Sequence, residues 1–433
     1  MRTHLLSVCA LCLATAAAMA GEAGKEAAPA GPLAGLPSAP GPHIEKIKAL
    51  GDNEWLDLGQ PAPDPKWGLA EGRGYTNKMA YAPDLVGAFL CGEGPHGATH
   101  KRGGGEYYAD DVFFYDLMAN RWICVSPGSN MAGFKMKLDA NGFEAAEDGQ
   151  NVPIAFAVHG YECNEYIPGF GKFMTLETGS PYSKKLMEFR KAWLGDKPYG
   201  RALGKNPFLY DAKTGRWERR RVEGDGPKTN FCKSLTWVES LKRVMYYGRG
   251  SDFWLYDPEA GKWSHVEGKG EPPQGTRMGY EGTLCHDTKR DRLYVFNSGQ
   301  KEIPWIYDIK TDTWSNPHAK NQPYPGQDYA RGVRKLGSTT SGVHYDSVND
   351  VAVMNLVIDQ GSGDPRNIPS KSLGLAVYNP ERNAWEDIET GDSGAGSSFY
   401  SPELNVHVYY ACRDGRTDGT IKVYRYKRTA ARQ

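Results

Sequence analysis

Aromatic, acidic and apolar positions recur along the chain with one fixed spacing. A Tyr followed by Asp or Asn precedes a Trp by seven positions at Tyr115/Trp122, Tyr210/Trp217, Tyr256/Trp263, Tyr307/Trp314 and Tyr378/Trp385. Apolar residues that favour strands come before each Tyr, and turn formers such as Lys213-Thr214-Gly215 separate it from its Trp. Because side chains on the two sides of a short turn pair across antiparallel strands, each phrase predicts a β-hairpin held by an aromatic pair.

A second aromatic-rich hairpin precedes each of these, so that one unit predicts a four-stranded meander. The clearest instances are 79–81 with 89–92, 235–237 with 244–248, 283–285 with 293–296, 343–345 with 351–353, and 399–400 with 406–410. The last unit stops after Val423-Tyr424 without a Trp, whereas Glu54-Trp55-Leu56-Asp57-Leu58 has the pattern of the missing fourth strand. Closing the last sheet with this N-terminal strand would remove an open edge and give six units.

The repeat resembles that of the kelch family, over about residues 53 to 428. The resemblance implies an all-β, six-bladed β-propeller closed by an N-terminal strand in the last blade. Kelch blades end their second strand in adjacent glycines, whereas this chain has Gly92-Glu93-Gly94 and Gly248-Arg249-Gly250. We therefore expect a divergent propeller, similar to kelch proteins or to the central domain of galactose oxidase. The fold by itself does not settle the function.

The repeated Tyr, Asp and Trp residues are expected to be structural. Aromatic residues that recur in every unit of a repeat protein form the core between neighbouring units. The Asp or Asn after each Tyr is expected to close the turn between the two strands. We therefore do not expect these side chains to bind a ligand.

The N-terminal region predicts export. Residues 1–20 combine an early Arg2, an apolar stretch and the small-residue ending Ala18-Met19-Ala20, which is the pattern of a signal peptide. The Ala-, Gly- and Pro-rich residues 21–42 predict a flexible linker, residues 43–428 the propeller and residues 429–433 a C-terminal tail. We expect a secreted or periplasmic protein.

The balance of charges excludes two classes of partner. Lys plus Arg and Asp plus Glu each total 52, so the chain has no net field to attract nucleic acid or an anionic membrane. Beyond the first twenty residues, no apolar stretch approaches the ~18 residues of a membrane span. We expect no nucleic-acid partner, no membrane insertion and a monomer.

Six cysteines remain after the signal peptide: Cys91, Cys124, Cys163, Cys232, Cys285 and Cys412. The oxidising compartment of an exported protein favours disulfides, but the two Cα atoms of a disulfide must lie within about 7 Å of each other. In the predicted strands these residues lie in different blades or are separated by a whole strand. We therefore expect mostly buried free thiols that act as small apolar residues.

In the propeller that the resemblance implies, the longest connections between predicted strands share one face, toward blades one, two and five. They include 92–110, 178–206 and 360–371 within blades, and 60–77, 127–152 and 317–337 between blades. Loops this long in a compact domain are often functional.

Polar residues that would converge on the central opening of this face are the candidate ligand-binding residues: Arg73, Tyr75, Asn77, Glu93, Asn230, Arg249, Arg277, Asn297 and Arg413.

The sequence offers little sign of a metal or a contiguous catalytic motif. His96 and His100 have the spacing of a zinc motif, but that motif needs a helix and this stretch is rich in Gly and Pro. The Tyr–Cys and two-His pattern of copper radical oxidases has no match in the chain. We expect no metal and no cofactor, and we leave the catalytic residues unassigned.

The preferred function is a binding module for a glycan or another exported protein, acting through the long-loop face. The alternative is a non-metal enzyme that acts on a sugar, similar to the kelch-like sialate epimerases. The converging arginines are the only support for that alternative. A site assembled from several blades leaves no contiguous motif, so absence of one does not decide between the two.

Overall fold

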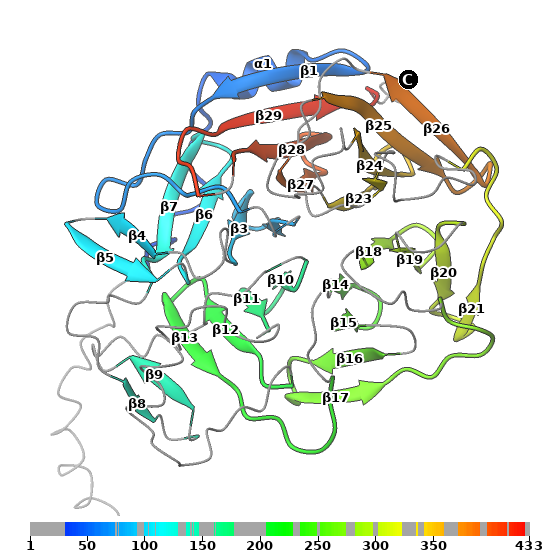
Figure 1. The fold of residues 1–433 in the computed structure, drawn as a ribbon, viewed down its shortest axis with the longest axis horizontal. Helices are drawn as coiled ribbons and strands as arrows, with labels where there is room; N and C mark the ends of the chain where they lie inside the picture. Colours follow the sequence, from blue (N-terminus) through cyan, green and yellow to red (C-terminus); the bar gives the residue numbers. More distant parts are fainter. Residues whose placement is uncertain are drawn as a thin grey trace, which may run out of the picture.

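The structure is a computed structural model that describes residues 31–428, apart from several internal segments. These segments are 74–75, 77, 93–98, 103, 109, 129–135, 139–140, 142, 147–159, 161, 177–204, 228–233, 249–251, 274–281, 298–301, 323–334, 337–341, 359–370, 390–395 and 414. The described strands form six antiparallel sheets arranged in a ring around a central axis (Figure 1). The all-β, six-bladed propeller predicted from the sequence is confirmed.

Each blade is a meander whose first strand lies nearest the axis. Blade one is β2 (Ala80–Ala82), β3 (Gly87–Leu90), β6 (Val112–Asp116) and β7 (Arg121–Ser126); blade two is β10 (Asn164–Ile167), β11 (Lys172–Thr175), β12 (Phe208–Asp211) and β13 (Arg216–Arg219). Blade three is β14 (Ser234–Val238), β15 (Arg243–Tyr247), β16 (Phe253–Asp257) and β17 (Lys262–His265); blade four is β18 (Gly282–Asp287), β19 (Arg292–Asn297), β20 (Trp305–Asp308) and β21 (Thr313–Ser315).

The last two blades depart slightly from this plan. Blade five is β23 (Val343–Asp346), β24 (Val351–Ile358), β25 (Lys371–Asn379) and β26 (Ala384–Glu389), and the short β22 (Lys335–Leu336) also pairs with β24. Blade six is β27 (Ser397–Ser401), β28 (Val406–Ala411), β29 (Thr420–Arg425) and β1 (Glu54–Gly59). Two further hairpins, β4 (Thr99–Arg102) with β5 (Gly105–Tyr108) and β8 (Met136–Leu138) with β9 (Glu144–Ala146), lie in the predicted long connections.

The repeated Tyr and Trp are directly opposite each other in every outer hairpin. The register pairs Tyr115 with Trp122, and the other four predicted pairs are matched in the same way. The ring centroids of the five pairs lie 4.6–5.4 Å apart. All five Trp side chains are buried, at 8% exposure or less. The prediction that they form the core between blades is confirmed.

The turns of these hairpins share one chemistry. The Asp after the Tyr accepts backbone N–H groups of the turn, as Asp257 does from Glu259 and Ala260. The last turn residue has a left-handed backbone, which Asn, Asp and Gly tolerate best. Where that residue is Asn or Asp, its side chain also accepts the Tyr hydroxyl, as Asn383 does from Tyr378 at 3.0 Å.

The ring is closed by strands from opposite ends of the chain. β1 pairs with β29 so that Trp55 lies opposite Tyr424 and Leu56 opposite Val423, which confirms the predicted closure. Asn53 takes the left-handed turn position and accepts the Tyr424 hydroxyl at 2.8 Å. Blade six therefore contains the same aromatic pair and turn contact as the other blades, although no turn joins its two outer strands.

A short helix, α1 (His43–Ala49), precedes the closing strand and lies along the outer edge of blade six (Figure 1). The carbonyls at the end of a helix lack partners within it. Arg425 donates to the carbonyls of Lys48 and Leu50, and Arg428 donates to those of Lys48, Ala49 and Leu50. Two arginines from the C-terminal end of the propeller thus hold the N-terminal helix in place.

Residues 31–42 belong to the segment for which the sequence predicts a flexible linker, and in the structure they pack against the propeller. Leu33 is buried with the core between blades one and two. Ser38 donates to Asp116 of blade one at 2.6 Å, and Gly41 N–H donates to the carbonyl of Met118 at 2.8 Å. Small residues in this segment permit close approach to the blade turns, for a Cβ at Gly31 would lie 2.5 Å from the backbone of Gly215.

Five of the six cysteines are within the described residues, and all five are buried thiols that form no disulfide: Cys91, Cys124, Cys163, Cys285 and Cys412. The predicted absence of disulfides is confirmed for these five, and Cys232 lies outside the described residues. Burial raises the pKa of the Cys91 thiol to about 12, so it is an apolar core residue and a poor nucleophile at neutral pH.

The inner turn of blade one places a β-branched residue where the backbone is left-handed. Val86 has φ 49°, at the position held by Asn405 in blade six and Asp350 in blade five. We expect Val86→Asn to raise the free energy of unfolding by about 1 kcal/mol, because Asn tolerates this backbone far better than Val. Guanidinium denaturation measures the change. Asn405→Val should cost more than this, because it also removes the hydrogen bonds of the Asn405 side chain with Tyr400, Asn349 and Lys427. An unchanged stability of Val86→Asn would contradict the assignment of strain to this turn.

Candidate functional site

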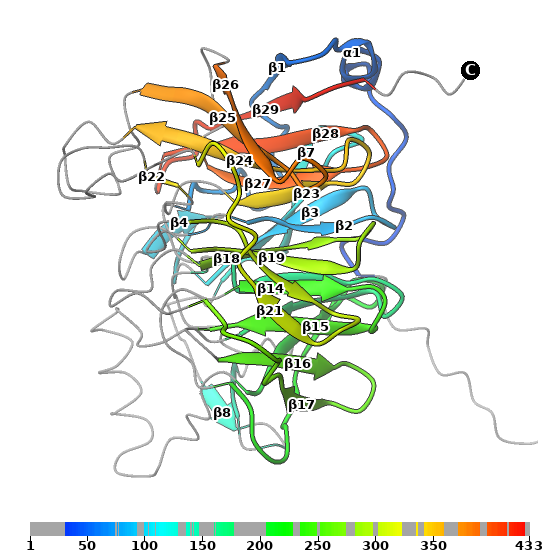
Figure 2. The same ribbon diagram turned by 90° about the vertical axis from the view of Figure 1, so that its right-hand side faces the viewer.

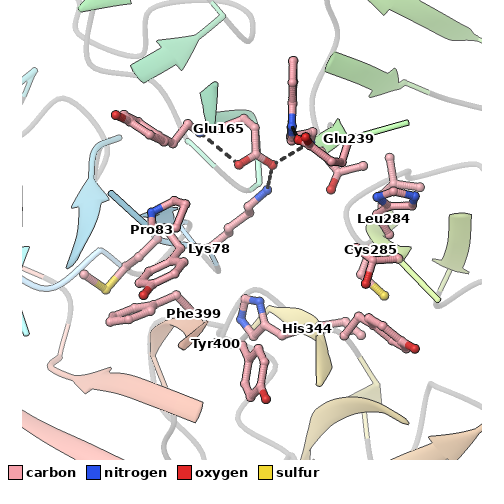
Figure 3. Close-up of a pocket in the computed structure, with 18 of the residues that line it drawn as sticks. Lys78, Pro83, Glu165, Glu239, Leu284, Cys285, His344, Phe399 and Tyr400 are labelled. Carbon is pink, nitrogen blue, oxygen red and sulfur yellow. Dashed lines mark hydrogen bonds and ion pairs between the residues drawn. The ribbon is translucent and has the colours of Figure 1, made fainter. Parts of the chain in front are cut away.

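A pocket of about 250 Å³ lies on the propeller axis, and all six inner strands contribute to its wall (Figure 3). Its rim includes Pro83, Pro168, Glu239 and Thr288, which belong to the turns between the first and second strands of blades one to four. The pocket therefore opens toward the face of short inner turns. The long connections singled out by the sequence leave the strands at the opposite face.

One equivalent position recurs in the pocket wall from blade to blade. This position is the residue before the first-hairpin aromatic, and its occupants are Ala80, Glu165, Thr236, Cys285, His344 and Phe399. All of these except Ala80 line the pocket, together with neighbours such as Trp237 and Tyr400. Corresponding positions of successive blades meet at the axis, so five side chains with different chemistry surround one cavity.

The pocket contains an ion pair that links three blades. Lys78 of blade one donates to Glu165 Oε2 of blade two at 2.6 Å and to the carbonyl of Leu235 in blade three at 2.8 Å (Figure 3). Glu165 also accepts the backbone N–H groups of Tyr166 and Trp237 at 2.9 and 3.1 Å. Both charged side chains are only about a tenth exposed, at 12% and 10%. The pair is therefore fixed in place, and its charges compensate each other.

A second carboxylate is buried on the axis beyond this ion pair. Glu162 of blade two accepts the hydroxyl of Ser234 in blade three at 3.0 Å and that of Thr283 in blade four. Burial raises the pKa of Glu162 to about 7, although both hydroxyls and the charge of Lys78 favour its ionised form. The polar side chains of Lys78, Glu165 and Glu162 therefore tie blades one to four together.

Two histidines in the pocket wall are held in the neutral form. His344 Nε2 shares a hydrogen bond with the Ser398 hydroxyl at 2.8 Å, and burial, helped by the charges of His407 and Lys78, lowers its pKa well below the usual range. His286 lies 3.1 Å from Asp291, and burial outweighs that carboxylate and also lowers its pKa. At neutral pH, both rings therefore add no charge to the pocket.

The tyrosine hydroxyls of the wall are already used between blades. Tyr166 donates to Asp84 of blade one at 2.7 Å, and Tyr400 donates to Asp346 of blade five at 2.7 Å. Tyr81 donates to Glu403 of blade six. Because these hydroxyls bind carboxylates in neighbouring inner turns, the tyrosines contribute mainly their rings to the pocket.

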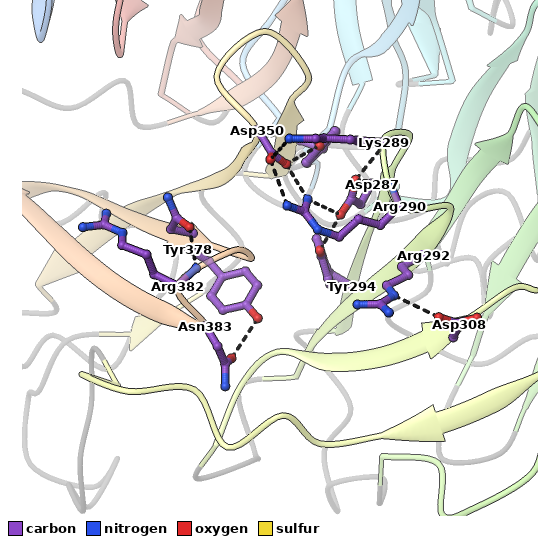
Figure 4. Close-up of polar contacts among 12 residues, drawn as sticks. Asp287, Lys289, Arg290, Arg292, Tyr294, Asp308, Asp350, Tyr378, Arg382 and Asn383 are labelled. Carbon is purple, nitrogen blue, oxygen red and sulfur yellow. Dashed lines mark hydrogen bonds and ion pairs between the residues drawn. The ribbon is translucent and has the colours of Figure 1, made fainter. Parts of the chain in front are cut away.

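An ion-pair cluster at the seam of blades four and five fixes the neighbouring part of the rim (Figure 4). Arg290 of blade four binds Asp350 of blade five through both of its terminal nitrogens, at 2.5 and 2.9 Å, and also contacts Asp287 at 3.1 Å. Lys289 adds a contact to Asp350 at 2.6 Å. The resulting environment lowers the pKa of Asp350, so this carboxylate stays ionised and the seam stays closed at neutral pH.

The structure describes the side chains of two of the nine candidate ligand-binding residues. Arg73 is buried and donates to Asp111 at 2.6 Å, and both side chains have 0% exposure. Arg102 of β4 lies 3.0 Å from the same carboxylate. Arg413 is exposed, next to Gly72 at the junction of blades six and one. The structure thus places Arg73 in an ion-pair cluster under the β4–β5 hairpin.

For the other seven candidate ligand-binding residues, the structure does not describe the side chain. The backbone of Asn297 ends β19, opposite Gly282, and its side chain is not described. Six candidates lie outside the described residues: Tyr75, Asn77, Glu93, Asn230, Arg249 and Arg277. His96 also lies outside them, and His100 is described only as backbone of β4. A ligand site on the long-loop face accordingly stays a prediction.

The pocket residues were not singled out from the sequence, although a signal for them exists. In each blade, the first hairpin has an aromatic residue and, five positions later, a turn residue with a left-handed backbone, such as Tyr345 and Asp350. When the six hairpin sequences are aligned on these two residues, the pocket-lining residues fall in one column of the alignment, just before the aromatic residue. Glu165 and His344 then stand out, because the same column holds Ala80, Cys285 and Phe399 in other blades.

Within the described part of the chain, no cluster of three or more His, Cys, Asp or Glu side chains could hold a metal ion. Within the same residues, no helix has the length and apolar character needed to cross a bilayer.

No protein-family model matches the chain, and neither does any curated protein. Solved structures similar to it include a member of the DUF4221 family from Bacteroides vulgatus (10% identity, TM-score 0.45, 88% of this chain and 99% of that one). Others are a protein of unknown function from Bacteroides thetaiotaomicron (10%, 0.46, 87% and 76%) and the GH74 xyloglucanase of Xanthomonas campestris (12%, 0.40, 82% and 43%). At these identities and TM-scores the likeness is one of fold alone. The kelch resemblance therefore stays a prediction.

Proposed function

We propose that this protein is a binding module for a glycan, and that one end of the ligand enters the axial pocket. The observation that carries the proposal is the pocket wall, to which every blade contributes and which combines aromatic rings with fixed polar groups. Sites for small ligands are typically concave and largely apolar, with a few well-placed hydrogen-bonding groups. A sugar ring presents both apolar C–H faces and hydroxyls, so it fits such a wall.

The contacts of the ionisable groups favour binding over catalysis. Glu165 is occupied by Lys78 and two backbone N–H groups, and His344 is bonded to Ser398. A general acid or base must be able to exchange a proton with the substrate. Groups already held in protein hydrogen bonds can position a ligand, but they are poorly placed to move a proton. This argument supports the binding module that the sequence prefers.

The alternative, a non-metal enzyme that acts on a sugar, has Glu162 as its candidate acid or base, although this side chain is not among those that line the pocket. Burial raises the pKa of this carboxylate to about 7, and such shifts are common at catalytic sites. Its hydroxyl partners Ser234 and Thr283 belong to other blades, which equally fits a structural role at the axis. Turnover of a bound glycan that is lost in Glu162→Gln would favour the enzyme.

Blocking the pocket tests the binding proposal. Thr288 is exposed in the inner turn of blade four and lines the pocket, so Thr288→Trp should obstruct the cavity without disturbing the core. We expect the variant to lose glycan-array binding by about tenfold or more, because the ligand end and the new ring compete for one space. Thr311→Trp, in the outer turn of the same blade, is the matched control and should bind normally.

The same array distinguishes the two faces of the propeller. If Thr288→Trp binds like the wild type, the axial pocket is not the site. A double variant, Arg249→Ala with Arg277→Ala, then tests the predicted site on the long-loop face. Arg73 is left unchanged in this variant, because its loss would leave the buried Asp111 with one ion-pair partner fewer and would destabilise the fold.

A further inference from the structure

His286 contributes one unused ring nitrogen to the axial pocket. The residue lines the wall from blade four, and its Nε2 lies 3.1 Å from the carboxylate of Asp291. The hydroxyl of Ser240 in blade three donates to the same carboxylate at 2.6 Å, so Asp291 is fixed at the seam of the two blades. A carboxylate accepts hydrogen bonds and does not donate them, so the ring proton is on Nε2. Among the residues that the structure describes, none bonds Nδ1 of His286, and this nitrogen is left as an acceptor.

The ring of His286 is uncharged at neutral pH. Burial lowers the pKa of His286 and outweighs the nearby carboxylates of Asp291, Asp287 and Glu239, which raise it. Glu239 is itself paired with Lys242. The His286 side chain is only 7% exposed, so a hydrogen bond that a ligand makes to it is largely shielded from bulk water. A neutral ring with its proton on Nε2 accepts a hydrogen bond at Nδ1 and cannot donate one there.

Lys78 supplies the complementary group. Its ammonium reaches from blade one to the carboxylate of Glu165 and the carbonyl of Leu235, which use two of its three N–H groups (Figure 3). The described part of the chain offers no further partner to this ammonium, so the third N–H is a donor at the pocket wall. Glu165 compensates the positive charge at 2.6 Å. The wall therefore presents a group that only accepts at His286 and a group that only donates at Lys78.

We propose that the axial pocket binds the acetamido group of an N-acetylated amino sugar, whose amide N–H is donated to His286 Nδ1 and whose carbonyl oxygen accepts from Lys78. The inference rests on the proposed glycan-binding function and names the class of sugar. An acetamido group carries its donor and its acceptor on separate atoms, and its methyl group is apolar. The rings of Trp237, Phe399 and Tyr400 line the same pocket and offer apolar surface to the methyl group and to the sugar ring.

Two other substituents at the same position of a sugar satisfy this wall less well. A hydroxyl has to donate to His286 and accept from Lys78 through a single oxygen, and it brings no methyl group to the aromatic rings. An ammonium can donate to His286 but has no acceptor for Lys78, and the two like charges repel each other. The expected order of affinity is therefore acetamido, then hydroxyl, then ammonium.

Trisaccharides that differ only in this substituent test the order. The equally linked trimers of N-acetylglucosamine, glucose and glucosamine carry an acetamido group, a hydroxyl and an ammonium at the same ring position. In calorimetric titrations at neutral pH, we expect the acetamido trimer to bind at least about tenfold more tightly than the hydroxyl trimer, because the hydroxyl leaves a buried polar group poorly paired. Equal binding of these two trimers, with both blocked by Thr288→Trp, overturns the acetamido inference and leaves the binding pocket in place.

Two substitutions of His286 separate its contact with Asp291 from its contact with the ligand. His286→Gln keeps an amide N–H for Asp291 and removes the acceptor at Nδ1, so the acetamido preference should fall by about tenfold. His286→Asn brings an amide oxygen close to the position of Nδ1 and should keep most of the preference. His318→Asn is the matched control, because His318 contacts Glu302 at 2.6 Å, is 74% exposed and has a left-handed backbone that suits Asn. A preference that survives in His286→Gln overturns the assignment of this residue.

The pH dependence of binding gives a second readout. Protonation of His286 adds a hydrogen at Nδ1 that would face the amide N–H, so wild-type affinity for the acetamido trimer should be constant at neutral pH and weaken below pH 6.5. His286→Asn has no proton to gain and should bind equally across this range. The same pH profile in both proteins would show that His286 does not make the contact.

The glycan array separates failure of this inference from failure of the proposed function. If no trimer binds and the ligands on the array carry no acetamido group, the inference fails and the glycan-binding function stands. Array ligands that do carry the group support the inference only if their deacetylated forms bind more weakly. If nothing binds in either assay, the proposed function itself falls.

Discussion

Replacing Trp122 with alanine is expected to lower the free energy of unfolding by ~3–5 kcal/mol, as large-to-small changes in a well-packed core do. Trp122 is 1% exposed. Its ring packs against Tyr115 across the hairpin, with centroids 5.4 Å apart, and against Tyr410 of blade six at 4.9 Å. The substitution therefore removes contacts within blade one and at the seam with its neighbour. Chemical denaturation followed by fluorescence measures the loss.

Phe170→Ala is the control for that experiment. Phe170 lies in an inner turn of blade two and is 39% exposed, so its loss should change stability by less than about 1 kcal/mol. An equal effect of the two substitutions would contradict the view that the repeated Trp residues form the core between blades. It would also weaken the interpretation that Trp55 and Tyr424 form a sixth aromatic pair equivalent to the other five.

Stability is expected to fall as pH rises from about 4.5 to about 7, by up to ~3 kcal/mol from Glu162 alone. Burial raises the pKa of this carboxyl from the usual 4.5 to about 7, so over this range the folded state holds a proton that the unfolded state has released. The stabilisation is fully present below pH 4.5. Above about pH 7 the charged form is buried in the folded protein, and the stabilisation is lost.

Glu162→Gln isolates this effect. The amide keeps an oxygen for the Ser234 and Thr283 hydroxyls and carries no charge, so the variant should be more stable than the wild type at pH 8. The two proteins should converge near pH 4.5. Melting curves at several pH values give the comparison, with Glu259→Gln as the exposed control. A pH dependence that is the same in Glu162→Gln and the wild type would show that Glu162 titrates normally.

The sequence predicts the blades well because each one is specified by local chemistry. A Tyr and a Trp seven positions apart can face each other only across a hairpin of fixed turn length, and Tyr210 with Trp217 does so. The helix α1 was not predicted, because its seven residues are stabilised from far along the chain. Arg425 and Arg428 bind its last carbonyls, and nothing near α1 in sequence signals that contact.

The candidate site was harder to predict, because its residues are one per blade and depend on the register between blades. Arginines such as Arg73 were selected for their ligand chemistry, yet Asp111 uses the guanidinium of Arg73 in a buried ion pair. Glu165 and Lys78 carry opposite charges on different blades, and only the closed ring brings their atoms to 2.6 Å. Local sequence patterns identify the position in each blade that faces the axis. They do not say which polar groups at that position remain available to a ligand.

The pairing of β1 with β29 makes completion of the ring depend on the order in which the chain is synthesised. The strand around Trp55 leaves the ribosome early, and its partner around Tyr424 leaves it hundreds of residues later. Until then, blade one has no neighbour on one side, and the early strand is an unpaired edge that can pair incorrectly. A polypeptide that stops before Tyr424 can complete its earlier blades but cannot close the circle. The joining of the two strands therefore acts as a completeness check, because only a chain that reaches Tyr424 supplies the partner of the strand around Trp55 and closes the ring.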